Sequence, residues 1–121
     1  MAKLVLVVDD EADMATTYAR LLRRQGFRVV CVGTRVAGLR AIEAEPPRLV
    51  IADLRLPDGD GLDVVRAARA LPAPAPVIVA TVLASRETRQ ASMAAGAAAF
   101  LAKPFATEAF SSLVRQVLGG P

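Results

Sequence analysis

The alternation of short apolar runs with segments of helical character is the feature that most constrains this fold. Each apolar run suits one strand, and each is followed by residues with helical spacing or capping signals. The predicted strands cover Leu4–Val8, Phe27–Val32, Leu49–Asp53, Val77–Thr81 and Ala97–Leu101. Strands that alternate with helices form a parallel sheet through right-handed crossovers. We therefore expect an α/β, doubly wound (βα)5 flavodoxin-like fold, a five-stranded parallel sheet of order 2-1-3-4-5 with helices on both faces.

Five helices fit the intervening segments. The first has an apolar face that includes Tyr18 and Leu22, and it is expected to stop at Gly26. The other four are expected from Thr34 to the Pro46-Pro47 pair, over Asp60–Ala70, over Ser85–Ala95, and after an N-cap at Thr107. On the third helix the spacing predicts Leu62, Val65 and Ala68 as the inward-facing residues.

The composition excludes several functional classes. Because the chain contains no histidine, it cannot hold a His-based catalytic triad or a His-containing zinc site. It has no run of about 18 apolar residues and no secretory signal pattern, so we expect a cytoplasmic location and no membrane contact. The formal net charge is +3, but no Lys/Arg run with interleaved aromatic residues predicts nucleic-acid binding. The single cysteine, Cys31, lies in an apolar strand and is expected to be buried.

Polar residues follow the predicted strands at their carboxyl ends. They are Asp9 and Asp10 after the first strand, Asp53 at the end of the third, Thr81 at the end of the fourth, and Lys103 after the fifth. Because parallel strands share one carboxyl edge, and strands 1 and 3 should be neighbours, three carboxylates are expected to gather there. Such carboxylates repel one another unless a hard divalent cation such as Mg²⁺ binds between them.

This constellation suits phosphoryl transfer. A carboxylate such as Asp53 can act as a nucleophile and form an aspartyl-phosphate. A metal ion, the Lys103 ammonium and the Thr81 hydroxyl would then stabilise the three equatorial phosphoryl oxygens. Each residue also has an ordinary structural explanation, as a helix cap, a turn residue or a solvated side chain, but their coincidence at one edge favours a functional site.

With these residues identified, the chain resembles the receiver domain of two-component response regulators over essentially its whole length. The resemblance rests on V-L-V-V-D-D-E at residues 5–11, D-L-R-L-P-D-G-D-G-L at residues 53–62, Thr81, and F-L-A-K-P-F at residues 100–105. It implies that Asp53 is the phosphoacceptor and that Thr81 and Lys103 contact the phosphoryl group. It also implies that Thr81 and Phe100 form the switch pair, and that the Lys103–Pro104 bond is cis.

The resemblance implies a metal site and signalling partners as well. Asp10, Asp53 and the Arg55 backbone carbonyl would bind Mg²⁺ or Mn²⁺, with Asp9 helping through water. Residues 1–121 would form one receiver domain of a phosphorelay, phosphorylated by a sensor histidine kinase or a histidine phosphotransfer protein. Phosphorylation would reshape the surface of the fourth helix, fifth strand and fifth helix. Such a domain is no conventional enzyme, and it is either a single-domain regulator or a receiver from a longer protein.

Three departures from the family pattern carry expectations. Val82 replaces a usually small residue beside Thr81, so we expect a narrower entrance and slower phosphorylation. Arg55 and Leu83 stand where the family tunes self-hydrolysis, and neither suits the orientation of an attacking water, so we expect a long-lived phosphoryl group. The Gly96–Phe100 stretch lacks the acidic pair of dimerising receivers, so we expect a monomer rather than a dimer held by those salt bridges, while hydrophobic pairing of this Ala-rich surface leaves a phosphorylation-dependent dimer open.

Three alternatives remain at this stage. A degenerate receiver would act as a protein-interaction module without phosphorylation, and the bulk of Val82 keeps this reading open. A cofactor-binding flavodoxin-like protein would need a phosphate loop after the first strand, where Asp9, Asp10 and Glu11 are electrostatically unsuitable. A metal-dependent phosphohydrolase would share the aspartyl-phosphate step but would need a further acid and a substrate-covering insertion.

Overall fold

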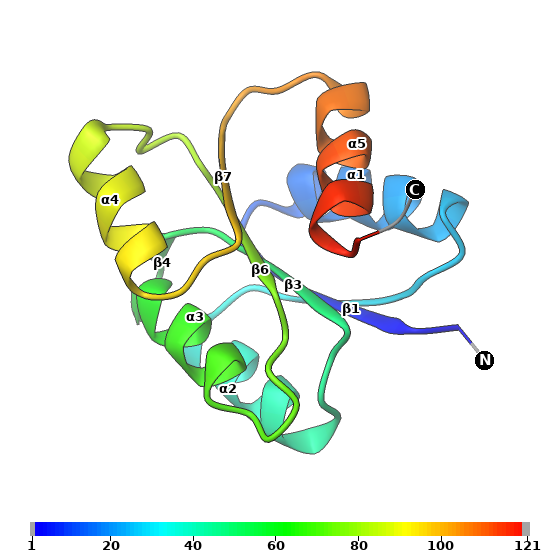
Figure 1. The fold of residues 1–121 in the computed structure, drawn as a ribbon, viewed down its shortest axis with the longest axis horizontal. Coiled ribbons are helices and arrows are strands. Elements are labelled where there is room, and N and C mark those ends of the chain that lie inside the picture. Colours follow the sequence, from blue (N-terminus) through cyan, green and yellow to red (C-terminus); the bar gives the residue numbers. More distant parts are fainter. Residues whose placement is uncertain (1, 120–121) are drawn as a thin grey trace.

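The computed structural model describes residues 2–119, and it contains the predicted five-stranded parallel sheet. The strand order is β2-β1-β3-β6-β7, which is the expected order 2-1-3-4-5 in the numbering of the structure (Figure 1). The main strands are β1 (Leu4–Val8), β2 (Arg28–Val32), β3 (Leu49–Ala52), β6 (Val77–Thr81) and β7 (Ala99–Ala102). The expected domain limits at residues 1 and 121 lie outside the described range.

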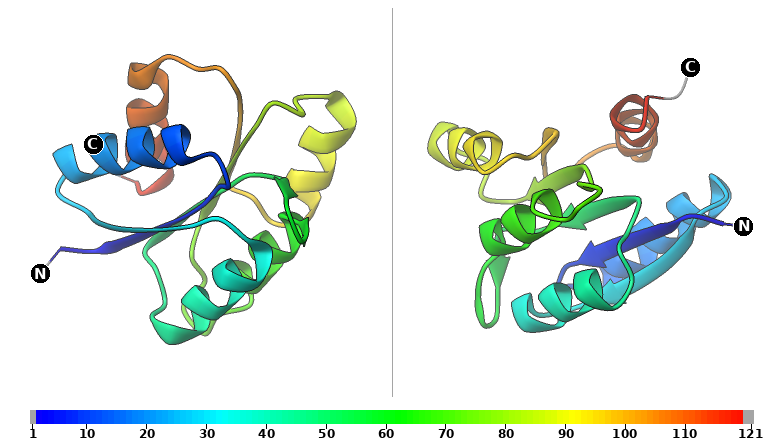
Figure 2. Two further views of the ribbon diagram at one scale, coloured as in Figure 1. Left: turned by 180° about the vertical axis from the view of Figure 1, so that it is seen from behind. Right: turned by 60° about the horizontal axis from the view of Figure 1, so that its bottom comes forward.

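Helices cover both faces of this sheet, as predicted (Figures 1 and 2). They are α1 (Ala12–Arg24), α2 (Arg35–Ala44), α3 (Leu62–Arg69), α4 (Arg86–Ala94) and α5 (Thr107–Val117). α1 and α5 lie on one face, while α2, α3 and α4 lie on the other. Within residues 2–119, no helix combines the length and the apolar character needed to cross a membrane.

The continuous apolar runs of the sequence follow from this two-sided cover. Val5 and Val7 of β1 pack against the α1/α5 layer, whereas Leu6 and Val8 pack against the α2/α3 layer. Because successive side chains point to opposite faces, a central strand buried on both faces is apolar at every position. The aromatic residues Tyr18, Phe105 and Phe110 stack together on the α1/α5 side.

Several local expectations are wrong. The edge strand β2 pairs with β1 alone, and Cys31 on it is exposed rather than buried. Thr107 is the first helical residue of α5, and Ala106 occupies the N-cap without a side-chain hydrogen bond. On α3, which begins only at Leu62, Val65 and Ala68 are buried and Leu62 packs half-buried against the core as expected, but Val64 is buried as well.

The loop after β3 contains a small ribbon that the sequence pattern did not reveal. β4 (Arg55–Leu56) pairs antiparallel with β5 (Gly59–Asp60), and the chain then enters α3. The Asp58 carboxylate accepts hydrogen bonds from the N–H groups of Arg35 (2.7 Å) and Val36 (3.0 Å) at the start of α2. These hydrogen bonds lower the pKa of Asp58 and attach the ribbon to the start of α2.

Gly61 closes this loop directly against the chain that carries Asp53. Its N–H donates to the Leu54 carbonyl at 2.8 Å, so the two backbones are in contact. A Cβ atom placed on Gly61 would lie 1.9 Å from the backbone oxygen of Asp53. Only glycine therefore fits here, and the reason is the close backbone approach rather than an unusual φ.

We predict that Gly61→Ala lowers the free energy of unfolding by about 2–3 kcal/mol, because the added methyl group must displace rigid backbone. Urea denaturation measures this change. Gly33→Ala is the matched control, because its Cβ would lie 3.6 Å from the nearest atom, the Cα of Asp10, which is an ordinary contact. Equal stability of the two variants would contradict the proposed constraint.

Candidate functional site

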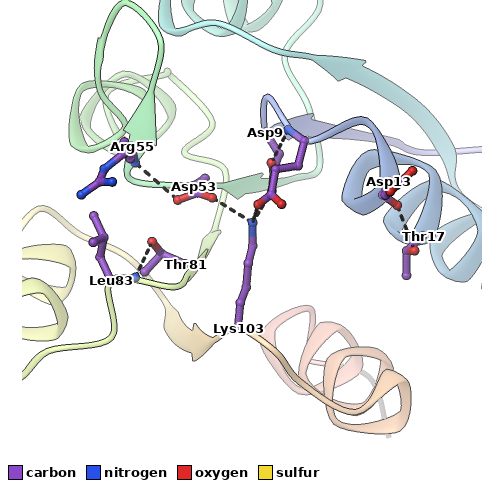
Figure 3. Close-up of polar contacts among 9 residues, drawn as sticks. Asp9, Asp13, Thr17, Asp53, Arg55, Thr81, Leu83 and Lys103 are labelled. Atoms are coloured by element: carbon purple, nitrogen blue, oxygen red, sulfur yellow. Dashed lines mark hydrogen bonds and ion pairs between the residues drawn. The ribbon is translucent and has the colours of Figure 1, made fainter.

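Four of the predicted residues meet at the carboxyl edge of the sheet (Figure 3). Asp9 follows β1, Asp53 follows β3, Thr81 ends β6, and Lys103 follows β7. All four are withdrawn from solvent: Asp9, Asp53 and Thr81 are buried residues, and the Lys103 side chain is only 4% exposed. The Lys103–Pro104 peptide bond is cis, as the family resemblance implied.

Lys103 joins the carboxylates of two strands. Its Nζ donates to Asp9 Oδ2 at 2.7 Å and to Asp53 Oδ2 at 2.8 Å, and a longer bond of 3.3 Å reaches Glu11 Oε1. Burial by itself would lower the pKa of Lys103, but the hydrogen bonds to Asp53 and Asp9 outweigh it, so the pKa is raised. Lys103 is therefore a permanent ammonium within this site.

One ammonium does not balance the acidic groups around it. Carboxylate oxygens of Asp9, Glu11 and Asp53 all lie within 4.8 Å of one another. Burial raises the pKa of Asp9, although hydrogen bonds from Lys103 and from the Glu11 N–H oppose that shift. The uncompensated negative charge and the hard oxygen donors fit a divalent cation such as Mg²⁺ or Mn²⁺.

The acidic cluster differs in one member from the predicted ligand set. Glu11 belongs to the three-carboxylate cluster, whereas Asp10 does not. Asp10 is exposed and lines a cleft of about 420 Å³ together with Asp53, Arg55 and Val82. The sequence places Glu11 in the acidic run after the first strand but indicates no role for it. Glu11 is the N-cap residue of α1, and its side chain does not cap the helix but accepts the 3.3 Å hydrogen bond from Lys103.

The remaining polar contacts hold the two loops beside Asp53. The Arg55 N–H donates to Asp53 Oδ1 at 3.3 Å, while the Arg55 residue itself is exposed. The Thr81 hydroxyl oxygen accepts a hydrogen bond from the Leu83 N–H at 3.1 Å. Val82 is 66% exposed at the mouth of the cleft. The orientation of the Thr81 hydroxyl is thus fixed by its own loop.

Phe100 lies on the α4 side of the sheet, on the strand that pairs with the strand of Thr81. It pairs with Val79, two residues before Thr81, so Phe100 and Thr81 share one face. The ring is half-buried, and the guanidinium carbon of Arg89 lies 5.7 Å from its centroid. The two residues predicted as a switch pair therefore lie on one face of neighbouring strands, offset by two residues, and Arg89 is a neighbour of Phe100 that the sequence pattern does not indicate.

This arrangement can support chemistry at a carboxylate. Asp53 has one oxygen bound by Lys103 and the other near the Arg55 N–H, and it borders the cleft. A tetrahedral oxyanion group on Asp53 would meet the Lys103 ammonium, the Thr81 hydroxyl and a cation held by the acids. Such convergent positive and hydrogen-bonding groups stabilise phosphoryl transfer.

Comparisons with known proteins agree on one family. A family model described as the response regulator receiver domain matches residues 5–115. The transcriptional regulatory protein PrrA of Mycobacterium tuberculosis is 35% identical over 114 residues, which are 94% of this chain and 49% of PrrA. RegA of Rhodovulum sulfidophilum, a photosynthetic apparatus regulatory protein, is 36% identical over 83% of this chain and 55% of its own. The chain thus spans about half the length of these curated relatives.

Solved structures lead to the same family. A CheY-like receiver domain protein of Methanospirillum hungatei superimposes with a TM-score of 0.92 at 29% identity, covering 98% of this chain and 95% of its own. The receiver domain of a Pseudomonas aeruginosa sensor histidine kinase, solved with magnesium coordinated in its active-site cleft, gives a TM-score of 0.86 at 28% identity. That match covers 99% of this chain and 100% of the other.

We predict that Mg²⁺ stabilises this protein through the buried acids. At one hundred times the dissociation constant, the free energy of unfolding should rise by about 2.7 kcal/mol, because the cation binds the folded state alone. Thermal unfolding with and without Mg²⁺ measures this. Asp9→Asn should stabilise the metal-free protein, because burial disfavours its charge, and should weaken the response to Mg²⁺.

Asp13→Asn is the control, because Asp13 is exposed and lies outside the three-carboxylate cluster. This variant should keep the full response to Mg²⁺. An identical response in Asp9→Asn and Asp13→Asn would contradict a cation site at the buried acids.

Proposed function

The chain belongs to the family of response regulator receiver domains, and we propose that it accepts a phosphoryl group on Asp53. As a receiver domain it is a signalling domain rather than a conventional enzyme. The observation that carries the proposal is the Lys103 ammonium, buried at 2.8 Å from Asp53 Oδ2 beside further acids. A structural salt bridge alone would need one carboxylate, whereas this site keeps an excess of negative charge for a cation.

The proposed reaction is an in-line displacement at phosphorus. A carboxylate oxygen of Asp53 forms the new P–O bond as the P–N bond to a donor imidazole breaks, and the imidazole leaves with that electron pair. Lys103 and Thr81 hydrogen-bond to phosphoryl oxygens and hold the group in line. Bound Mg²⁺, or Mn²⁺, would neutralise charge on those oxygens; Asp9, Asp10, Asp53 and the Arg55 carbonyl are the proposed ligands, with Glu11 added by its position in the acidic cluster.

The proposed output is a change at the α4–β7–α5 surface. In this proposal the Thr81 hydroxyl leaves the Leu83 N–H for the phosphoryl group, and Phe100 turns into the space that opens. The position of Thr81 and Phe100 on the same face of the paired strands β6 and β7 supports this coupling. The added charge thereby biases an element with two arrangements.

The proposed partners follow from the family. A sensor histidine kinase or a histidine phosphotransfer protein would supply the phosphoryl group in the cytoplasm, as part of a phosphorelay. We propose that residues 1–121 act as one monomeric receiver domain without direct contact to nucleic acid. PrrA is named as a transcriptional regulatory protein, and the match covers 49% of its length.

We predict that one phosphate is added to the protein by a small phosphodonor with Mg²⁺, and that Asp53→Asn abolishes this addition. Intact-mass measurement detects the added phosphate directly. Asp13→Asn, which removes an exposed carboxylate on α1, should still be phosphorylated. A wild-type protein that gains no phosphate, with either a small donor or a phosphorylated partner, would instead support a degenerate receiver that binds partners without phosphorylation.

We also predict that Val82→Ala accelerates phosphorylation by a small phosphodonor severalfold. The side chain is 66% exposed and lines the cleft that borders Asp53, so a smaller residue widens the approach. The initial rate of phosphate incorporation measures this effect. Val36→Ala is the control, because Val36 is also exposed but lies on α2, outside the cleft. An unchanged rate in Val82→Ala would show that Val82 does not restrict the entrance.

A further inference from the structure

The contact between Arg89 and Phe100 lies at the α4–β7–α5 surface, and the proposed reaction does not use it. Arg89 lies on α4, and its guanidinium carbon is 5.7 Å from the centroid of the Phe100 ring. A guanidinium at this distance is attracted by the negative face of an aromatic ring. Arg89 is exposed and the ring is half-buried, so the contact caps the outer side of Phe100.

We propose that Arg89 is a positioning residue that holds Phe100 in its unphosphorylated orientation and thereby opposes the phosphorylated state. This inference rests on the function proposed above and identifies a residue that regulates the same site. A ring held by a guanidinium must lose that contact before it can turn. The contact therefore stabilises only one of the two arrangements and shifts the equilibrium toward it.

The structure also connects Arg89 to Thr81 through the β6–α4 loop. The Leu83 N–H donates to the Thr81 hydroxyl oxygen, and the Leu83 carbonyl accepts a hydrogen bond from the Thr88 hydroxyl. Thr88 also completes the capping box of α4 with Ser85, so the beginning of α4 is fastened to this loop. Arg89 follows Thr88 directly.

This connection couples the orientation of the Thr81 hydroxyl to the position of Arg89. If the Thr81 hydroxyl turns toward a group on Asp53, the Leu83 N–H loses its acceptor. The loop and the first turn of α4, which share hydrogen bonds, can then move and carry Arg89 away from the ring. Within residues 2–119 Arg89 forms no hydrogen bond or salt bridge with Asp53, Thr81 or Lys103, so we infer that it acts on phosphorylation through Phe100.

Removing the Arg89 guanidinium should raise the apparent affinity of the protein for a ligand that selects the phosphorylated arrangement. A cation–π contact at an exposed site corresponds to about a two- to fivefold change in an equilibrium constant. If the binding-competent arrangement is the minor one, a ligand selective for it binds more tightly by the same factor. Beryllofluoride with Mg²⁺, which mimics the phosphoryl group on Asp53, is the ligand to use.

The test is the apparent dissociation constant of beryllofluoride for the full chain, measured by NMR titration in saturating Mg²⁺. Arg89→Gln should bind about two- to fivefold more tightly than the wild type. Arg86→Gln is the matched control, because Arg86 is an exposed arginine on the same helix with no aromatic ring contact in residues 2–119. Arg89→Lys, which keeps the charge but not the planar guanidinium, should fall between Arg89→Gln and the wild type.

A second readout separates positioning from a general effect on stability. The ring resonances of Phe100, assigned with Phe100→Leu, should shift in the unphosphorylated Arg89→Gln protein and not in Arg86→Gln. In the Phe100→Leu background, Arg89→Gln should leave the affinity for beryllofluoride unchanged, because the ring through which it acts is absent.

The outcomes distinguish this inference from the proposed function. If the wild type binds beryllofluoride but Arg89→Gln and Arg86→Gln bind it equally, the inference is overturned and the proposed function stands. An Arg89→Gln effect that persists in the Phe100→Leu background would also overturn it. If the wild type does not bind beryllofluoride, the proposed function fails and this inference fails with it.

Discussion

The buried ammonium of Lys103 is the interaction on which the functional edge of this structure depends. It joins Asp9 after β1 to Asp53 after β3 from its own position after β7, across 94 and 50 residues of sequence. Burying these charges is costly unless they are paired and hydrogen-bonded, and here each carboxylate also accepts a backbone N–H. The pairing is nevertheless incomplete, because Glu11 adds a third carboxylate to a single ammonium. That excess negative charge makes the site receptive to a divalent cation and to an exchange of partners by Lys103.

The surrounding backbone keeps this charged cluster in place. Gly61 brings the end of the ribbon against the Asp53 carbonyl, and Asp58 ties the same ribbon to the first N–H groups of α2. On the other side, Thr81 and Leu83 connect β6 to the capped start of α4. The loops that frame Asp53 are thus held by side-chain hydrogen bonds to backbone groups and by the close approach at Gly61, whereas the half-buried Phe100 side chain packs against the core and contacts Arg89. This difference in restraint is consistent with a fixed acceptor and a movable readout.

Much of the fold could be predicted because its signals are local and repeated. The strands are apolar at nearly every position, since helices cover both faces of the sheet, and Gly26 and the Pro46-Pro47 pair separate successive elements. Asp9, Asp53, Thr81 and Lys103 could be placed at one edge because parallel strands share their carboxyl ends. Predictions failed where the exposure of a residue or the start of a helix depends on pairing with other segments rather than on the local sequence. Cys31 is exposed because β2 is an edge strand, and the third helix starts late because the preceding residues pair as a ribbon.

The sequence by itself determined the alternating α/β architecture, the family to which the chain belongs, and the residues that meet at the carboxyl edge of the sheet. Only the tertiary structure decided how those residues share their charges: the exposed Glu11, rather than Asp10, joins the buried Asp9 and Asp53 in the three-carboxylate cluster. It also placed the guanidinium of Arg89, on α4, over the ring of Phe100, on β7. The physical reason is that periodicity records which face of an element is buried, whereas carboxylate positions and ring contacts depend on the angles at which loops return the chain.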